Sequence, residues 1–394
     1  MPRARRVHRP FRVVYEGRID GRTHGSWALV NDRLRRPLGG LVDLTVTVPG
    51  GDTPQPCDVW LSHYYPGLEG RDGFAPPPLG SGKWVCWVAW ELGPVPRAWE
   101  DAWRVGRVAE VWACSAHARR LLLASTALDP AKVRVVHYGV DPFVFSPEGP
   151  RLPRQSEAFR VLYVGGALPR KGCDLAVTAY CRAFAPGEPA RLVLKLQGVK
   201  SFYATAPAIA APAGRADFQV VDGDGLSDAQ MGALYRSVDA VVQPYRAEGF
   251  CLPLLEAMAS GLPVVYPSHG PGPEFVPPGA GIRVPSAAGE PDPGAVARAL
   301  RWLWKAPDER AEMGAKGRAG ALDLAWAHRA AVVAGALREV ASRPGPEDAF
   351  QPPSAKAPRR PVGGQLGDVQ PQGVGQDADP DAVEPEGELV GPAD

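Results

Sequence analysis

The sequence has little net charge, no closely spaced cysteines and no long apolar run. Its 394 residues carry a formal net charge of +1, which argues against a dedicated nucleic-acid partner. The six cysteines lie far apart, with no Cys-x-x-Cys pair and no histidine at ligand spacing, so we expect isolated buried thiols and not disulfides or a zinc site. No apolar stretch approaches the roughly 20 residues that cross a bilayer, and we expect a cytoplasmic protein.

The two ends of the chain differ in composition from its body. Residues 344–394 contain 18 Gly and Pro, ten acidic residues and three basic ones, with Phe350 as their one aromatic residue. Such a segment cannot bury a core, and we predict a disordered tail. The first dozen residues instead carry five arginines. They form a solvated arm or make a weak peripheral contact with an anionic membrane.

Between these ends, apolar β-branched runs alternate with stretches of helical spacing. Strands are predicted at 12–15, 41–48, 58–62, 84–89, 110–113 and 133–136, and helices at 26–34 and 116–124. A proline-rich bridge follows at 146–157. The pattern then restarts, with strands at 159–165, 192–196, 218–221, 240–244 and 263–266, and helices at 173–184, 228–237, 253–259, 295–304 and 326–340. Strands separated by helices indicate parallel sheets.

We therefore predict an α/β protein with two Rossmann-like domains facing across a cleft. Their boundaries are 1–150 for an acceptor-side domain and 151–343 for a nucleotide-binding domain, with the tail at 344–394. Open parallel sheets bind ligands outside the carboxyl ends of their strands. A cleft between two such edges suits a nucleotide-containing substrate.

The most informative segment begins at residue 240. A strand is predicted to end near 244, and a helix to start at Pro253 with Glu256 in its first turn. Glu248 lies in the loop between them. The backbone N–H groups of Gly249, Phe250, Cys251 and Leu252 would point out of the helix N-terminus, where an anion such as a diphosphate is favoured. Glu248 can accept from sugar hydroxyls, and Glu256 either accepts from a ribose or is only a structural first-turn carboxylate.

This segment, Glu248-Gly-Phe-Cys-Leu-Pro-Leu-Leu-Glu256, resembles the retaining glycosyltransferases of family four, which have the GT-B fold of two Rossmann-like domains. Their signature is two glutamates separated by seven residues. Residues 162–177 resemble the same family's strand, glycine loop and Arg-Lys-Gly element. The resemblance implies that Arg170 and Lys171 neutralise a departing diphosphate. Many members have an arginine where this chain has Gly166, so that contact must be absent or supplied elsewhere.

The first half is more divergent but also similar to the family, and the resemblance covers roughly residues 12–340. It implies that His63, at the end of a strand, faces the donor sugar, and that Gly25 belongs to a glycine loop at 21–26. Tyr138 replaces the usual asparagine and is expected to affect only the hinge. The helix beginning near Trp326 is expected to cross back to the first domain.

By resemblance, the protein moves a sugar from a nucleoside-diphosphate sugar to a glycan, lipid or small-molecule acceptor with retention of configuration, as in cell-surface polysaccharide biosynthesis. We expect no metal and no cofactor beyond the donor substrate, because Asp222-Gly-Asp224 reads as a turn. Two alternatives stay open. One is a catalytically degenerate binding or scaffold protein, and the other is a nucleotide-sugar epimerase, which would need further catalytic groups in the cleft.

Overall fold

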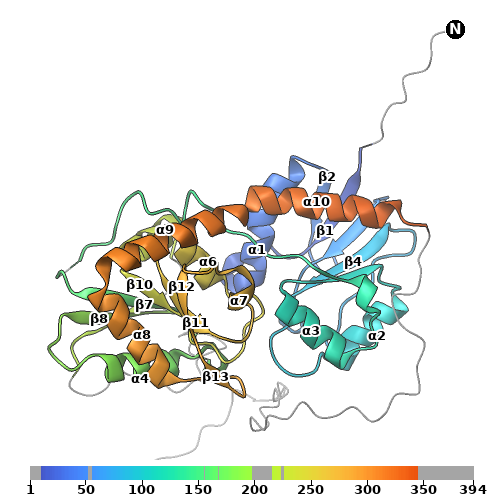
Figure 1. The fold of residues 1–394 in the computed structure, drawn as a ribbon. Helices are drawn as coiled ribbons and strands as arrows, with labels where there is room; N and C mark the ends of the chain where they lie inside the picture. The colour runs from blue at the N-terminus through green and yellow to red at the C-terminus, as the bar shows by residue number, and fades with distance from the viewer. Residues whose placement is uncertain are drawn as a thin grey trace, which may run out of the picture. The chain divides into compact units, whose positions relative to one another are not determined.

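The computed structural model describes residues 10–51, 56–154, 156–166, 168–197, 215–222 and 226–344. The predicted tail from residue 345 onward, four of the five early arginines and Asp224 lie outside the described residues. The body of the protein contains two six-stranded sheets and a small two-stranded one (Figure 1). The predicted α/β fold with two Rossmann-like halves is confirmed.

The first sheet is parallel, with the strand order β2-β1-β3-β4-β5-β6. Its strands are β1 (Arg12–Glu16), β2 (Asp43–Thr47), β3 (Val59–Ser62), β4 (Lys83–Val88), β5 (Glu110–Ala113) and β6 (Val133–Val135). The helices of this half are α1 (Gly21–Gly39), η1 (Pro66–Glu69), α2 (Arg97–Val105), α3 (Ala116–Ser125) and η2 (Pro130–Lys132). The strand order reverses between β1 and β3, so the loops after these two strands flank the position where open sheets bind ligands.

The second sheet is also parallel, with the order β12-β11-β10-β7-β8-β9. Its strands are β7 (Phe159–Gly166), β8 (Ala190–Gln197), β9 (Phe218–Asp222), β10 (Ala240–Val242), β11 (Val264–Pro267) and β12 (Gly281–Val284). The helices are η3 (Pro169–Lys171), α4 (Cys173–Ala183), α5 (Asp228–Arg236), α6 (Leu252–Ala259), α7 (Gly272–Phe275), α8 (Pro293–Lys305) and α9 (Pro307–Asp323), and β13 (Ser286–Ala287) pairs with β14 (Glu290–Pro291). Here the order reverses between β7 and β10.

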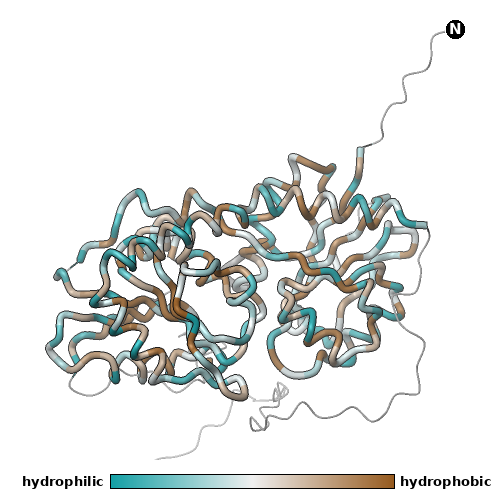
Figure 2. The backbone as a smooth tube through the Cα atoms, viewed as in Figure 1, coloured by the Kyte–Doolittle hydropathy of each residue, from teal (hydrophilic) through white to brown (hydrophobic). Residues whose placement is uncertain are grey.

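Apolar strands form the core of both halves (Figure 2). Every residue of β5 and β10 is buried. Five tryptophans of the first half are fully buried: Trp60, Trp87, Trp99, Trp103 and Trp112. Strands covered on both faces are expected to be continuously apolar, as β10 is, and β5 is apolar after its first residue, Glu110. The sheets are therefore rigid supports for the loops at their carboxyl ends.

The last helix, α10 (Trp326–Ser342), packs on α1 and β3 of the first half, as the resemblance implied. Its start is tied to the segment after β6, because Val140 N donates to Leu324 O and Trp326 N donates to Val140 O, both at 3.0 Å. A Cβ at Gly139 would lie 2.8 Å from the Trp326 ring, so a side chain at this position would prevent the two segments from crossing so closely.

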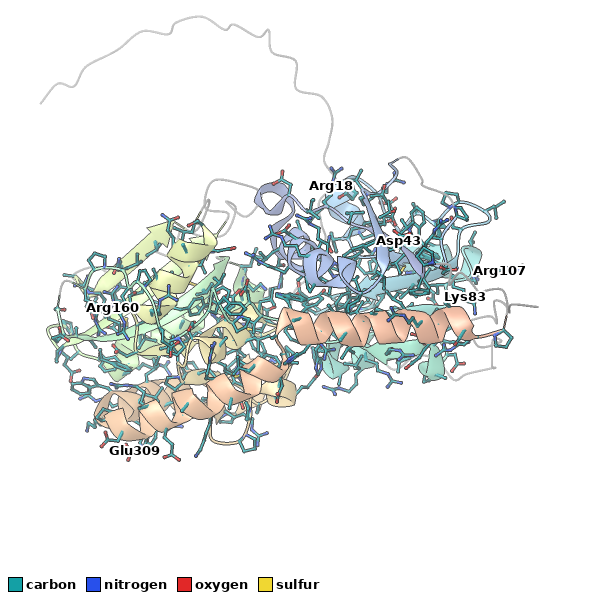
Figure 3. The ribbon with its side chains drawn as sticks, turned by 90° about the horizontal axis from the view of Figure 1, so that it is seen from above. Arg18, Asp43, Lys83, Arg107, Arg160 and Glu309 are labelled. Carbon is teal, nitrogen blue, oxygen red and sulfur yellow. The ribbon has the colours of Figure 1, made fainter. Side chains whose placement is uncertain are left out.

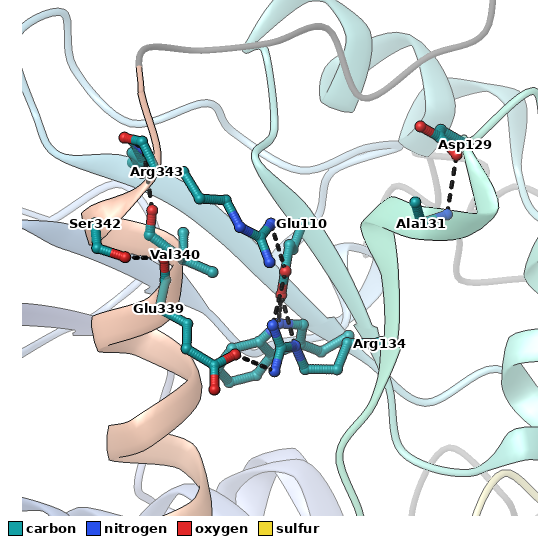
Figure 4. Close-up of polar contacts among 10 residues, drawn as sticks. Glu110, Asp129, Ala131, Arg134, Glu339, Val340, Ser342 and Arg343 are labelled. Atoms are coloured by element: carbon teal, nitrogen blue, oxygen red, sulfur yellow. Dashed lines mark hydrogen bonds and ion pairs between the residues drawn. The ribbon is translucent and has the colours of Figure 1, made fainter.

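A buried carboxylate anchors the far end of α10 (Figure 4). Glu110, 1% exposed, accepts from Arg134 Nε at 3.0 Å and pairs with Arg343 at 2.7 Å. Arg134 also pairs with Glu339 at 2.8 Å. Lys83 Nζ, which lies beside this helix end in Figure 3, donates to Val340 O at 3.0 Å and also to Arg343 O. The end of the described chain is thus held at the amino ends of β4 and β5, which begin with Lys83 and Glu110.

Helix α9 was missed by the sequence prediction, and its buried face explains why. The residues it buries are Gly314, Gly317 and Ala321, so it has no apolar stripe of the usual kind. It packs on α6, and so closely on the turn that follows α6 that a Cβ at Gly314 would lie 2.0 Å from Gly261 O. The two backbones approach this closely because glycine has no side chain at the point of contact.

A matched pair of helix glycines tests this packing. Gly314→Ala should destabilise the protein by about 1–3 kcal/mol, because the methyl group overpacks the contact between α6 and α9. Gly335, in α10, has no atom within 4 Å of an added Cβ, and Gly335→Ala should stabilise by about 0.5–1 kcal/mol through the reduced freedom of the unfolded chain. Urea unfolding of both variants measures the difference. Equal effects of the two substitutions would contradict the close packing.

Candidate active site

The loops after β7 and β10 meet at the reversal point of the second sheet. The first loop leads into η3, which contains Arg170 and Lys171, and then into α4. The two loops are joined by backbone hydrogen bonds from Arg246 N and Ala247 N to Arg170 O, at 2.8 and 3.1 Å. Gly172 has φ 73°, and a Cβ there would lie 2.0 Å from Pro244 O. The glycine of the Arg-Lys-Gly element therefore permits the two loops to touch.

This contact brings together the cation and the carboxylate that the sequence placed in separate motifs. Lys171 Nζ pairs with Glu248 Oε1, and Glu248 is only 6% exposed. Arg170 Nη2 pairs with Glu91 Oε1, from the loop after β4, at 2.8 Å. The other terminal nitrogen of Arg170 is buried and has no hydrogen-bond partner among the described residues. Two cations and one unsatisfied donor thus lie at the strand ends.

Glu256 is placed differently from the prediction. Helix α6 starts at Leu252, one residue before Pro253, so Glu256 lies in its second turn and not in its first. Its Oε2 accepts from Tyr235 Oη at 2.7 Å, and burial raises the pKa of the Glu256 carboxyl. An interaction with the N-terminal dipole of α6 therefore does not explain why a glutamate occupies this position. The binding of a ribose by Glu256 stays a prediction.

The loop before α6 packs against the first half. Gly249 O accepts from Ser115 Oγ at 2.6 Å and from Cys114 Sγ at 3.2 Å. The Phe250 ring stacks on Phe275 at 5.0 Å. Cys251 is buried and precedes the helix in a left-handed conformation, with φ 67°. These contacts hold the loop against its neighbours through the Gly249 carbonyl and the Phe250 ring, and the binding of a diphosphate to its N–H groups stays a prediction.

Two predicted glycine positions have different outcomes. Gly166, predicted to follow the strand 159–165, is the last residue of β7, and its carbonyl accepts from Tyr163 Oη at 3.2 Å. The segment 21–26 was predicted as a glycine loop, but residues 21–24 are helical and belong to α1. Gly25, with φ 57° and ψ −138°, interrupts that helix. The loop is therefore a kink at a single residue, which glycine adopts without strain.

His63 follows β3 and is completely buried. Its Nε2 lies 2.8 Å from Tyr138 Oη, and its Nδ1 contacts Asn31 Oδ1. Burial lowers the pKa of His63 to about 3, so the ring is neutral at physiological pH. Both ring nitrogens are occupied by protein groups. The expectation that Tyr138 affects only the hinge is wrong, because its hydroxyl contacts the histidine of the candidate site.

Sequence reasoning missed Glu274, which lies in α7 after a Gly-Pro-Gly-Pro turn. Its carboxylate accepts from the backbone N–H groups of Ala116 and His117 at 2.7 and 2.6 Å, and lies 3.5 Å from His137 Nε2. Burial tends to raise the pKa of Glu274, but the hydrogen bonds from His137 and the two N–H groups outweigh it and hold this pKa below its ordinary value. A carboxylate of the second half thus caps α3 of the first. A Glu directly after such a turn was the available signal.

Glu274→Gln tests this cap. A carboxyl whose pKa is lowered by folding stabilises the protein above its unfolded pKa of about 4.3, and this contribution is lost as the pH falls through the folded pKa. The variant should therefore be less stable by about 1–2 kcal/mol at neutral pH, and this deficit should become smaller when the pH is lowered to about 3. Glu309→Gln, at an exposed position of α9, is the control. Denaturant unfolding that gave the same deficit at both pH values would contradict the charged cap.

Comparisons with known proteins bear on these same residues. Residues 150–320 match the family model described as glycosyl transferases group 1. The MMP alpha-(1->4)-mannosyltransferase of Mycolicibacterium hassiacum is 30% identical over 249 residues, which are 61% of this chain and 57% of that protein. The chain spans about half the length of the curated relatives it matches.

Solved structures show the same fold. A glycosyltransferase from Rickettsia africae aligns with a TM-score of 0.64 at 12% identity, over 84% of this chain and 99% of that one. An Anabaena protein solved in complex with UDP-glucose aligns with a TM-score of 0.58 at 14% identity, over 83% and 99% of the two chains. Both likenesses confirm the GT-B fold.

None of the helices that the structure describes is long and apolar enough to cross a membrane. The residues brought together by the loops after β7 and β10, from Gly166 to Glu256, all lie within the range that matches the family model. The chain is therefore similar to the glycosyl transferases group 1 family, and residues 150–320 carry the match to its model.

Proposed function

We propose that this protein is a glycosyltransferase that moves a sugar from a nucleoside-diphosphate sugar to an acceptor. The observation that carries the proposal is the pairing of Lys171 with Glu248 at the reversal point of the second sheet. That position is where an open α/β sheet binds a nucleotide. In this ion pair, the Lys171 ammonium can bind a phosphate, and the Glu248 carboxylate can accept hydrogen bonds from sugar hydroxyls.

When the donor enters, the two groups exchange partners. Lys171 turns to the diphosphate, and Glu248 accepts from hydroxyls of the sugar. The buried, unpartnered nitrogen of Arg170 supplies a second donor for the phosphate oxygens, which compensates for the arginine that Gly166 replaces. Glu256 accepts from the ribose at the second turn of α6, where Tyr235 already orients one of its oxygens.

The proposed mechanism uses positioning and electrostatic stabilisation. Arg170 and Lys171 stabilise the negative charge that develops on the leaving diphosphate. The acceptor attacks from the face of the sugar that the diphosphate leaves, a leaving phosphate oxygen takes the acceptor proton, and the anomeric configuration is retained. The charge is carried by the two side chains, so we propose that transfer needs no metal ion.

The similar proteins support a hexose donor. One relative is named for mannosyl transfer, and one structural neighbour was solved with UDP-glucose. For this chain the substrate is a nucleoside-diphosphate hexose, and the acceptor enters from the first half, next to Glu91. The enzyme works in the cytoplasm, where nucleotide sugars are available.

The direct test is release of nucleoside diphosphate from a panel of nucleotide sugars, with and without EDTA. We expect turnover of at least one donor at the same rate under both conditions. Lys171→Ala should lower kcat by about 10²–10³, because it removes one stabilising donor from the transition state. Lys305→Ala, which removes the same charge from an exposed position in the last turn of α8, should leave kcat unchanged.

Three outcomes would contradict the proposal. A Lys171→Ala or Glu248→Ala variant as active as the wild type would show that the ion pair is not the site. Loss of turnover with EDTA would show that a metal carries the charge. A folded wild-type protein that binds nucleoside diphosphates but turns over no nucleotide sugar would favour the alternative of a degenerate binding protein.

A further inference from the structure

A buried polar network surrounds His63. Asn31 Nδ2 donates to the carbonyls of Arg18 and His63, at 2.7 and 3.1 Å. Its Oδ1 must then be the acceptor, and it receives Tyr15 Oη at 2.7 Å together with His63 Nδ1. Two carbonyls bonded to Nδ2 fix the orientation of this amide. The proton of the neutral His63 ring therefore lies on Nδ1.

This tautomer determines the direction of the next hydrogen bond. A neutral imidazole with its proton on Nδ1 has only a lone pair on Nε2. Tyr138 Oη, 2.8 Å away, must donate to that nitrogen. The hydroxyl proton of Tyr138 is thus committed to His63, and the lone pairs of its oxygen stay available to accept a hydrogen bond.

Tyr138 separates His63 from the loop that carries Glu248. On one side its ring contacts Trp87 at 5.1 Å and His63 at 5.5 Å. On the other side it makes an edge contact with Phe250 at 5.3 Å. Phe250 lies two residues after Glu248. Tyr138 thus contacts the loop that carries Glu248, whereas His63 is completely buried against Tyr138, Trp87 and Trp27.

We propose that Tyr138, and not His63, is the residue of the first half that contacts the donor's sugar in this protein. Its hydroxyl accepts a hydrogen bond from one hydroxyl of the sugar, while His63 and Asn31 position it. His63 is then a positioning residue. The inference rests on the proposed glycosyl transfer and assigns one specificity-determining contact within that site.

The test uses a set of donor analogues, each lacking one hydroxyl of the sugar. With the wild type, kcat/KM should fall at least about tenfold for one analogue, the one that lacks the hydroxyl bound by Tyr138. Tyr138→Phe should lower kcat/KM for the parent donor to that analogue's value and remove the discrimination between the two. The analogues lacking other hydroxyls should keep their wild-type ratios to the parent donor.

Tyr15→Phe is the matched control, because it removes a buried tyrosine hydroxyl from the same network on the far side of Asn31. It should keep the wild-type discrimination. Binding of uridine diphosphate and guanosine diphosphate alone, measured by thermal shift, should be the same in Tyr138→Phe as in the wild type, since the diphosphate does not reach Tyr138.

The outcomes separate this inference from the proposed function. If the wild type turns over the donor but Tyr138→Phe lowers kcat/KM by the same factor for the parent donor and for every analogue, the inference is overturned and the proposed function is not. Weakened diphosphate binding in that variant would also overturn the inference, by showing that Tyr138 only supports the fold. A wild type that turns over no nucleotide sugar would overturn both.

Discussion

The N-terminus of α3 is the point on which the arrangement of the site depends. It receives two groups of the second half: the carbonyl of Gly249 through the Ser115 hydroxyl, and the carboxylate of Glu274 on two backbone N–H groups. A helix N-terminus favours such partners because its first N–H groups lack intrahelical acceptors. These contacts place the loop with Glu248 next to the loop with Glu91.

The charges of the candidate site balance within the protein. Lys171 pairs with Glu248 and Arg170 with Glu91, so neither cation is left without a counter-charge in the closed arrangement. A buried unpaired charge would be costly, so Glu248 needs the hydroxyl donors of the sugar when Lys171 turns to a diphosphate. The same pairing explains how one glutamate can both neutralise a lysine before binding and orient a sugar afterwards.

The sequence predicted those parts of the structure that local pattern determines. Apolar strands such as β10 were found because both faces of each sheet are buried, and the segment from Glu248 to Glu256 carried the resemblance to the family. Helix α9 was missed because it buries glycine and alanine, which give no apolar stripe. The Gly25 segment was predicted as a loop because its glycines indicate a turn, yet one residue alone leaves the helix.

Contacts between distant segments could not be predicted in this way. Tyr138 lies 75 residues from His63, and Glu274 lies 158 residues from Ala116. A single sequence does not say which side chains such segments bring together, although the family resemblance implies that Tyr138 stands where an asparagine is usual. The substitution was visible in the sequence, and only the fold shows that it reaches the candidate site.

The most direct measurement of the central claim is the anomeric configuration of the transferred sugar, followed by proton NMR from the first turnovers. If the diphosphate held by Arg170 and Lys171 leaves from the face that the acceptor attacks, the first product has the same anomeric configuration as the donor. An inverted product would contradict the account, because inversion requires attack from the opposite face with a separate protein base.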